Sequence, residues 1–305
     1  YVVPLVPLDK TGQVPAAGQI VMLENLRFWP EEEANDEQFA QKLAGLADVY
    51  VNDAFSCAHR AHASTYAVAQ QLPCFSGPVM AAELDALSAA MDKPQRPVAA
   101  VVGGSKVSTK LPVLTNLIEK VDILLLGGGM ANTFLTARGE YMGASLMEPH
   151  LIETAADILV KAEQLGCRVM LPEDGLAATT LSACVPHREI LNKDILATEM
   201  MLDIGPKAID SYQQALKEVR TLLWNGPMGA FEVRPFDTAT VNLAQIVAKA
   251  TEKGYLLSVA GGGDTVAALS HAGVAEQFSY VSLAGGAFLE YVEGKTLPGV
   301  EVLSR

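Results

Sequence analysis

The sequence predicts a two-domain α/β protein whose parallel sheets are covered by helices on both faces. Its 305 residues suggest two domains at about 150 residues per domain, each able to bury its own core. Short apolar runs alternate with longer segments of helical period, which is typical of a covered parallel sheet. Five apolar runs in the second half lead straight into glycine-rich turns. In an open parallel sheet, turns at the carboxyl ends of the strands line the ligand crevice.

The first part of the chain, which opens in the apolar segment Tyr1 to Val6, contains two predicted strands and a helix. The runs Ile20 to Leu23 and Val49 to Val51 predict the strands. Between them, apolar residues recur at i, i+4 and i+7, which predicts an amphipathic helix over Glu37 to Leu46. The acidic triplet Glu31 to Glu33 is interpreted as a solvated helix start.

A connecting helix is predicted next, over Met80 to Met91, and Pro94 and Pro97 end it. We therefore expect an N-terminal domain over residues 1–91, with this helix from about residue 80. A C-terminal domain is expected over residues 92–287, and residues 288–305 are expected to return towards the N-terminal domain. About 90 residues before the hinge are few for a typical α/β domain, so the N-terminal domain is predicted to be incomplete.

The second part repeats a plan in which a helix is followed by a strand. One helix of apolar period begins at Leu151 and stops at Gly166, and a strand follows over Arg168 to Leu171. Another helix is predicted over Thr238 to Lys253, and the strand after it covers Tyr255 to Val259.

Charge and cysteine usage argue against several classes of protein. Lys and Arg number 22 against 35 Asp and Glu, and the formal net charge of −13 argues against a general nucleic-acid binder. Anionic small molecules are still compatible, because a local pocket can oppose the net charge. The four cysteines are widely spaced, so we expect a reducing compartment and neither a disulfide framework nor a zinc site. The longest uncharged stretch, Ala61 to Ala82, is broken by glutamines and prolines and is not a membrane span.

The five junctions between a strand and a glycine turn predict a nucleotide pocket. Glycine lets backbone N–H groups approach an anion closely, and the next helix adds its positive N-terminal dipole. A single junction of this kind is more often only a tight turn, whereas five in one domain favour a polyphosphate ligand. The junctions are Val98 to Gly104, Ile123 to Gly129, Leu222 to Pro227, Leu256 to Thr265 and Val281 to Gly286.

The glycine turns lack the common nucleotide fingerprints G-x-x-x-x-G-K-[ST] and G-x-G-x-x-G. A helix starting after Gly104 would place Lys106 and Lys110 one turn apart on one face, where two ammonium groups suit a phosphoryl group being transferred. The alternative is a pair of solvated surface lysines. Asp264 has two compatible interpretations, as a helix N-cap and as a ligand of Mg²⁺ bound to phosphates.

Two arginines of the first part suit a small phosphorylated acid. Arg27 and Arg60 each follow a predicted strand, and two parallel strands would bring them to the same crevice edge. Arginine makes bidentate contacts to carboxylate and phosphate. Ion pairs with Glu24 or Asp53 are an equally compatible interpretation of the spacing.

Several further motifs follow one another in order along the chain. They are Leu23 to Phe28, Asn52 to Phe55 with Ala58 to His62, Gly103 to Val107, Gly127 to Ala131, Trp224 to Gly229 with Phe231 and Glu232, Gly261 to Thr265 and the ending Glu293 to Gly299. In this order the motifs resemble the phosphoglycerate kinase family, and the resemblance covers essentially the whole chain. The family's opening segment, with its Arg-x-Asp-x-Asn and His-Leu-Gly-Arg motifs, has no counterpart before Tyr1.

The resemblance implies two Rossmann-like, three-layer αβα domains joined by a hinge helix. The N-terminal domain would bind 3-phosphoglycerate or 1,3-bisphosphoglycerate, and the C-terminal domain would bind ATP or ADP with Mg²⁺. The phosphoryl group would pass in line and directly between the acyl phosphate and ADP, on domain closure. The family further implies a monomeric, cytoplasmic glycolytic enzyme.

The resemblance also implies roles for the basic residues. By matched position, Arg27 and Arg60 would hold the phosphoglycerate. Lys106 and Lys110 would contact the nucleotide phosphates, with Lys110 nearest the transferred group and therefore catalytic.

Other site residues implied by the resemblance lie in the glycine turns. Gly262 and Gly263 would join Lys110 in catalysis, and Asp264 would hold Mg²⁺. The remaining nucleotide-binding positions would be Gly103, Gly104, Gly127, Pro227, Glu232 (on the ribose), Gly261 and Thr265.

The sequence departs from the family pattern at two further positions. Leu283 replaces a threonine that could cap a helix or contact phosphate, so slightly weaker phosphate binding is expected. Glu173 stands where an uncharged residue is common, and we assign it no function.

A chain truly lacking the opening segment would expose sheet edges, and poor solubility is then expected.

Two other functions compete with a phosphotransferase. A nicotinamide-dependent dehydrogenase would require G-x-G-x-x-G and an acidic residue about 20 positions later, and its fingerprint is missing. A nucleotide-binding remnant without activity would bind Mg-ADP and show no turnover.

Overall fold

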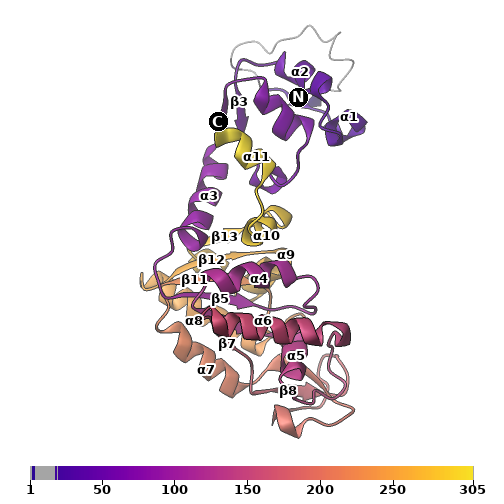
Figure 1. Cartoon of the computed structure of the whole chain (residues 1–305), viewed down its shortest axis with the longest axis vertical. Coiled ribbons are helices and arrows are strands. Elements are labelled where there is room, and N and C mark those ends of the chain that lie inside the picture. The colour runs from indigo at the N-terminus through magenta and orange to yellow at the C-terminus, as the bar shows by residue number, and fades with distance from the viewer. Residues whose placement is uncertain (1, 4–17, 19, 305) are drawn as a thin grey trace. The chain divides into compact units, whose positions relative to one another are not determined.

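The computed structural model describes residues 2–3, 18 and 20–304, so most of the apolar segment Tyr1 to Val6 lies outside the described residues. Residue contacts divide the chain into two compact units (Figure 1). Unit 1 comprises Tyr1–Leu84 with Lys295–Arg305, and unit 2 comprises Asp85–Gly294. The first division lies inside helix α3 (Pro78–Met91), before the boundary expected from the sequence.

Unit 2 is built on a six-stranded parallel sheet with the strand order β13-β12-β11-β5-β6-β7. Every residue of β5, β6 and β11 is buried, as continuous apolar strands covered on both faces require. The predicted α/β class with a parallel sheet is confirmed. The strands are β5 (Val98–Val102), β6 (Ile123–Leu126), β7 (Arg168–Met170), β11 (Thr221–Asn225), β12 (Leu257–Gly261) and β13 (Tyr280–Ser282).

Helices cover this sheet in two groups. Apolar side chains of α7, α8 and α9 share one buried cluster with strand residues such as Val101, Leu125 and Trp224. In the other group α4 contacts α6 and α10, and α4 and α6 cross in front of the sheet in Figure 1. The helices are α4 (Leu111–Lys120), α5 (Gly128–Ala137), α6 (Ile152–Gln164), α7 (Pro206–Leu216), α8 (Thr238–Glu252), α9 (Gly263–His271) and α10 (Gly286–Val292).

The helices and strands that hydrophobic spacing predicts in unit 2 agree with α6, β7, α8 and β12 to within two residues at each end. The predicted stop of α6 is also confirmed, because Gly166 follows its last turn with a φ of +75°. That left-handed conformation is open to glycine and closes the helix.

Strand register brings the five glycine turns to one edge of the sheet. Asn225, the last residue of β11, pairs with Val102, the last residue of β5, and Gly261 of β12 pairs with Ser282 of β13. The five strands that lead into the turns are adjacent in the sheet. The prediction that these turns share one edge is therefore confirmed.

A three-stranded antiparallel sheet in unit 2 is not foreseen by the sequence analysis. Its strands are β8 (Asp174–Ala178), β9 (His187–Leu191) and β10 (Met200–Ile204), in the order β10-β8-β9. Asp174 holds β8 to α7, because its carboxylate accepts hydrogen bonds from the backbone N–H groups of Lys207 (3.0 Å) and Ala208 (2.8 Å). These N–H groups lie at the start of a helix, where no intrahelical acceptor is available.

Unit 1 contains two separate pairs of parallel strands among its described residues, β1 with β2 and β3 with β4. A small core forms where Phe39 and Leu43 of α2 pack with Ala63, Ala67 and Val68. The elements are β1 (Val2–Val3), β2 (Met22–Leu23), α1 (Pro30–Glu33), α2 (Glu37–Ala44), β3 (Tyr50–Asn52), β4 (Cys74–Ser76), the first part of α3 and α11 (Pro298–Glu301).

The acidic triplet of unit 1 corrects one expectation. Residues Glu31 to Glu33 do begin a helix, α1, but Glu32 is buried and is not solvated. Its carboxylate accepts hydrogen bonds from the backbone N–H (3.0 Å) and the hydroxyl (2.5 Å) of Ser64. A buried carboxylate needs such donors to replace water, and periodicity alone cannot reveal them.

In the part of the chain that the structure describes, no helix has both the length and the apolar character needed to cross a membrane.

Candidate active site

The turns after β5 and β11 touch through their backbones. Gly226 has a φ of +107°, and a Cβ atom on it would overlap the carbonyl oxygen of Gly103. A Cβ atom on Gly103 would in turn overlap the carbonyl oxygen of Pro227, and the N–H of Gly103 donates to the Asn225 carbonyl (3.1 Å). Only glycine permits this approach, so the buried Pro227 and these two glycines form one rigid junction.

The turn after β6 joins the same junction. The N–H of Gly128 donates to the carbonyl of Met228 (2.7 Å), and the N–H of Met130 donates to that of Gly104 (3.0 Å). The preceding Gly127 has no room for a Cβ atom, because Met228 fills the space. Backbone hydrogen bonds therefore connect the turns of β5, β6 and β11.

The turn after β12 is connected through side chains. The Asn225 amide, which is buried, donates to the carbonyl of Gly261 (2.7 Å), and the hydroxyl of Thr265 accepts from the N–H of Gly226 (2.8 Å). Gly262 has a φ of +97°, and its Cβ atom would lie 2.7 Å from the same Asn225 amide. Asn225 is a site residue that the sequence analysis did not single out. A polar residue closing a fully buried strand was the available signal.

Two glycines differ from these packed positions because they face open space. A Cβ atom on Gly104 or Gly263 would meet no atom within 4 Å. Gly104 still needs its φ of +121°, but Gly263 has no left-handed backbone. Nothing in the described residues therefore requires glycine at position 263, the first residue of α9. A ligand that closely approaches the backbone would require glycine at this position.

Lys110 lies at the centre of this edge. Its ammonium group donates to the side-chain oxygen of Asn225, and the lysine is half-buried. Burial lowers the pKa of Lys110 from its ordinary value to about 8, although the negative charge of Asp264 acts in the opposite direction. An anion bound next to Lys110 would therefore stabilise the charged form of its ammonium group.

Lys106 is exposed in a loop, which corrects the expected helix. Helix α4 starts only at Leu111, with Lys110 as its N-cap residue, so the two lysines are not one helical turn apart. The intervening residues form turns, in which the N–H of Lys110 donates to the carbonyl of Val107 (2.8 Å). Pro112, near the start of α4, favours a helix that begins at this point.

Asp264 is the second residue of α9 and not its N-cap, which corrects one of its two interpretations. The N-cap is Gly262, and the Asp264 carboxylate makes no capping hydrogen bond. The side chain is exposed, and a carboxylate there is stabilised by the helix dipole. Across residues 20–304, no three His, Cys, Asp or Glu side chains gather as a metal cluster. A single carboxylate suits Mg²⁺, which keeps several waters and shares its other positions with substrate phosphates.

The remaining predicted residues of unit 2 lie around these turns. Glu232 is exposed shortly after the Pro227 turn. Leu283 is 80% exposed and comes directly after β13. The next N–H, of Ala284, donates to the Ser282 hydroxyl (3.2 Å), and Gly285 then caps α10. The structure gives Glu173 no role beyond a backbone contact in which its carbonyl accepts from the N–H of Asn192 (3.2 Å).

Among the described strands of unit 1, the two arginines do not follow one sheet edge. Arg27 follows β2 and Arg60 follows β3, and these strands belong to different pairs. The guanidinium Nε of the exposed Arg27 lies 3.5 Å from the carboxylate Oε1 of Glu33, and Arg60 makes no ion pair with the described residues. The alternative ion pairs with Glu24 and Asp53 are wrong as well. Asp53 caps α3 by accepting from the N–H groups of Val79 (2.7 Å) and Met80 (2.9 Å), and Glu24 accepts from the N–H of Asn25 (3.0 Å).

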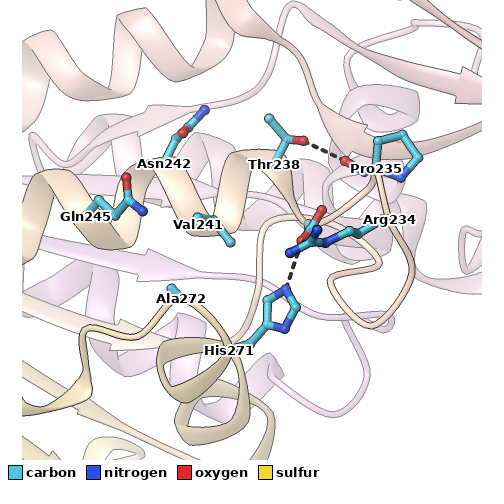
Figure 2. A pocket seen from close by; sticks show the side chains of 9 residues that line it. Arg234, Pro235, Thr238, Val241, Asn242, Gln245, His271 and Ala272 are labelled. Atoms are coloured by element: carbon cyan, nitrogen blue, oxygen red, sulfur yellow. Dashed lines mark hydrogen bonds and ion pairs between the residues drawn. The ribbon is translucent and has the colours of Figure 1, made fainter.

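A surface pocket lies elsewhere on unit 2, between the start of α8 and the end of α9 (Figure 2). Asp237 in this pocket accepts from the imidazole of His271 (2.8 Å) and lies 3.5 Å from the guanidinium of Arg234. The Asp237 carboxylate therefore already has partners within the pocket. None of the lining residues belongs to a glycine turn, so the pocket is separate from the predicted site.

Comparison with known proteins identifies the family. The family model described as phosphoglycerate kinase matches residues 8–295. The phosphoglycerate kinase of Xanthobacter flavus is 58% identical over 290 residues, which are 95% of this chain and 73% of the relative. The phosphoglycerate kinase of Zymomonas mobilis is 58% identical over 286 residues, which are 94% of this chain and 72% of the relative. The chain thus spans about three quarters of these relatives.

Solved structures agree with the sequence matches. The structure of phosphoglycerate kinase from Coxiella burnetii superposes with a TM-score of 0.94 at 42% identity, covering 99% of this chain and 76% of that one. The phosphoglycerate kinase of Pyrococcus horikoshii superposes with a TM-score of 0.78 at 29% identity, covering 94% and 73%. The chain belongs to the phosphoglycerate kinase family of phosphotransferases.

Proposed function

We propose that the protein transfers a phosphoryl group reversibly between 1,3-bisphosphoglycerate and ADP, giving 3-phosphoglycerate and ATP. The observation that carries the proposal is the meeting of glycine turns from adjacent strands around a half-buried lysine, Lys110. Backbone N–H groups and a cation at such an edge suit a polyphosphate. The match to the phosphoglycerate kinase family supports a carboxyl group as the acceptor of the phosphoryl group.

The nucleotide phosphates bind at the start of α9 in this proposal. Gly262, Gly263 and Thr265 surround them with backbone N–H groups and a hydroxyl, which the open space at Gly263 supports. Gly103, Gly104, Gly127 and Gly261 allow the turns to converge, and Pro227 and Glu232 border the adenosine, with Glu232 on the ribose. Lys106 and Lys110 neutralise phosphate charge, and Lys110 lies nearest the transferred group.

Mg²⁺ would be held by Asp264 together with the phosphates. When bound, it would neutralise charge on the nucleotide oxygens. The exposed carboxylate at the dipole of α9 and the lack of a larger acidic cluster among the described residues support this single protein ligand.

Arg27 and Arg60 hold the phosphoglycerate in this proposal, by bidentate contacts to its phosphate and carboxylate. The transfer is direct and in line, without a covalent enzyme intermediate, and domain closure excludes water from it. We further propose a cytoplasmic monomer without a nucleic-acid or membrane partner. The net charge of −13 supports the first of these exclusions.

A coupled assay tests the proposal. The proposed reaction forms 1,3-bisphosphoglycerate from 3-phosphoglycerate and ATP. An added NADH-dependent dehydrogenase reduces this product, and the oxidation of NADH is recorded. We expect turnover that falls by about 10²-fold or more in Lys110→Ala, because a donor to the developing charge is lost. Lys106→Ala shows whether the two lysines share this role, and Lys253→Ala, an exposed lysine after α8, is the matched control.

No turnover in the intact chain would overturn the proposed activity. If MgADP still bound under those conditions, the nucleotide-binding remnant would be the correct alternative. Turnover that is unchanged in Lys110→Ala would remove this lysine from the mechanism while leaving the activity in place.

A further inference from the structure

One buried carboxylate next to the proposed nucleotide site has no assigned role. Glu148 is 8% exposed, and it accepts hydrogen bonds from the backbone N–H (2.9 Å) and the hydroxyl (2.6 Å) of Ser108. Ser108 lies in the loop over residues 105–110, hereafter the lysine loop, two residues from both Lys106 and Lys110. Both donors of Ser108 therefore converge on one acidic side chain.

The other end of this contact is firmly anchored. The backbone N–H of Glu148 donates to the hydroxyl of Thr133 (3.1 Å), and the carbonyl of Leu146 accepts from the amide of Asn132 (3.1 Å). Asn132 and Thr133 are buried in α5, the helix that begins in the glycine turn after β6. Glu148 thus connects the lysine loop to a rigid part of the site.

Two of the hydrogen bonds inside the lysine loop are local. The Thr109 hydroxyl donates to the carbonyl of Lys106 (2.9 Å), and the N–H of Lys110 donates to that of Val107 (2.8 Å). Both bonds shape the turn without fixing its middle. The start of the loop is held to α5 by the bond from the N–H of Met130 to the carbonyl of Gly104 (3.0 Å), and its end is held by the contact of Lys110 with Asn225. Glu148 holds the middle of the loop, across 40 positions of sequence.

The chemistry of Glu148 explains why an acid is used there. Both oxygens of a carboxylate accept hydrogen bonds, so Glu148 can receive both donors of Ser108 at once. An amide has one oxygen and one NH₂ group, so one donor of Ser108 would face another donor. Burial acts to raise the pKa of Glu148, but hydrogen bonds from Ser108 and Val107 and the nearby His150 outweigh it and lower the pKa below the ordinary value. The side chain is therefore a charged acceptor at neutral pH.

We propose that Glu148 is a positioning residue, which holds Ser108 so that Lys106 and Lys110 face the nucleotide phosphates. This inference rests on the proposed function. It assigns Glu148 no contact with substrate, and it predicts an effect on the nucleotide and none on the phosphoglycerate.

Titration calorimetry of the whole chain with MgADP tests the proposal. We expect Glu148→Gln to weaken MgADP binding about tenfold, since a hydrogen bond to a charged group is lost and a donor faces a donor. Ser108→Ala, which keeps the backbone bond, is expected to weaken it about threefold. The double variant should be no weaker than Glu148→Gln, because the two residues act through one contact. Glu153→Gln, an exposed acid in the first turn of α6, is the control.

Kinetic constants separate positioning from a merely structural role. The KM for nucleotide should rise in Glu148→Gln. The KM for 3-phosphoglycerate should stay within about twofold of its value in the unsubstituted protein. A lower melting temperature with unchanged MgADP affinity would overturn the proposal. Should Glu148→Gln fail to fold, Ser108→Ala decides the question by the same criterion. Wild-type chain that binds no MgADP would overturn the proposed function itself, whereas normal wild-type binding with unaffected variants overturns only this inference.

Discussion

The two units of the molecule differ in how they build their proposed ligand sites. In unit 2, adjacent strands end in glycine turns that touch backbone to backbone, so the ligand edge is built by the main chain. In unit 1, the described strands form only two separate pairs, and the proposed ligand residues Arg27 and Arg60 are side chains on short turns. Rigid packing therefore defines one site, and long charged side chains define the other.

This difference predicts opposite responses to substitution. A change in a packed turn of unit 2 should cost stability, because neighbouring backbone cannot move aside. A change of an arginine in unit 1 should cost binding and leave stability nearly unaffected, because surface charges contribute little to folding.

The largest effect is expected for Gly226→Ala. The new Cβ atom overlaps the Gly103 carbonyl, and the φ of +107° is strained for alanine, so the free energy of unfolding should fall by about 3 kcal/mol or more. Urea unfolding measures this change. Gly263→Ala is the matched control, because its Cβ atom meets open space. It should change stability by less than about 0.5 kcal/mol while weakening MgADP binding. Equal stability losses in the two variants would contradict the packing account.

A second, large effect is expected in unit 1. Arg60→Ala should raise the KM for 3-phosphoglycerate by about 10²-fold, because a bidentate contact to an anion is removed. Its melting temperature and its MgADP affinity should remain those of the original chain. Steady-state kinetics with calorimetry distinguishes these effects. A parallel loss of MgADP affinity would break the distinction between the two units.

A smaller effect is expected from pH. Lys110, with a pKa of about 8, is charged at pH 7 and mostly neutral at pH 9, so MgADP binding should weaken about tenfold between these values. The sign for folding is opposite. The unfolded chain holds this proton up to the ordinary lysine pKa of 10.5, so the ligand-free protein gains stability from Lys110 as pH rises above 8.

Calorimetry at the two pH values checks the Lys110 assignment. Lys110→Arg, which stays charged throughout, is the control and should show a flat profile. An equally steep profile in this variant would assign the titration to another group.

The smallest effect is expected at Leu283. Leu283→Thr should tighten MgADP binding by about two- to threefold, because a hydroxyl is restored beside the start of α10 and an exposed leucine is removed. Unchanged or weaker affinity would refute this expectation. Leu181→Thr, at another exposed leucine that is not in a glycine turn, is a suitable control for the loss of apolar surface.

Much of unit 2 could be predicted from the sequence because its signals are local. A buried parallel strand is a continuous apolar run, a covering helix has a 3.6-residue period, and a glycine stops it. Helices α6 and α8 follow these rules closely. The shared edge of the glycine turns follows as well, because parallel strands all point the same way.

Other features depended on contacts between residues far apart in the chain. The antiparallel sheet of β8, β9 and β10 depends on pairings between segments with weak alternation. Glu32 is buried where Ser64, 32 positions away, supplies hydrogen-bond donors, and Lys110 is half-buried beside Asn225, 115 positions away. The loop that contains Lys106 contacts Glu148, 40 positions away from Ser108 in the sequence, through the two hydrogen bonds of Ser108.

The fold class, the strands of the main sheet and the turns that end them can be predicted from the residues alone, because hydrophobic periodicity and glycine act within a few residues. Which polar side chains are buried, and which partners they have, becomes clear only from the packed structure. Burial and hydrogen bonding depend on atoms brought together by packing, and no spacing in the sequence encodes those distances.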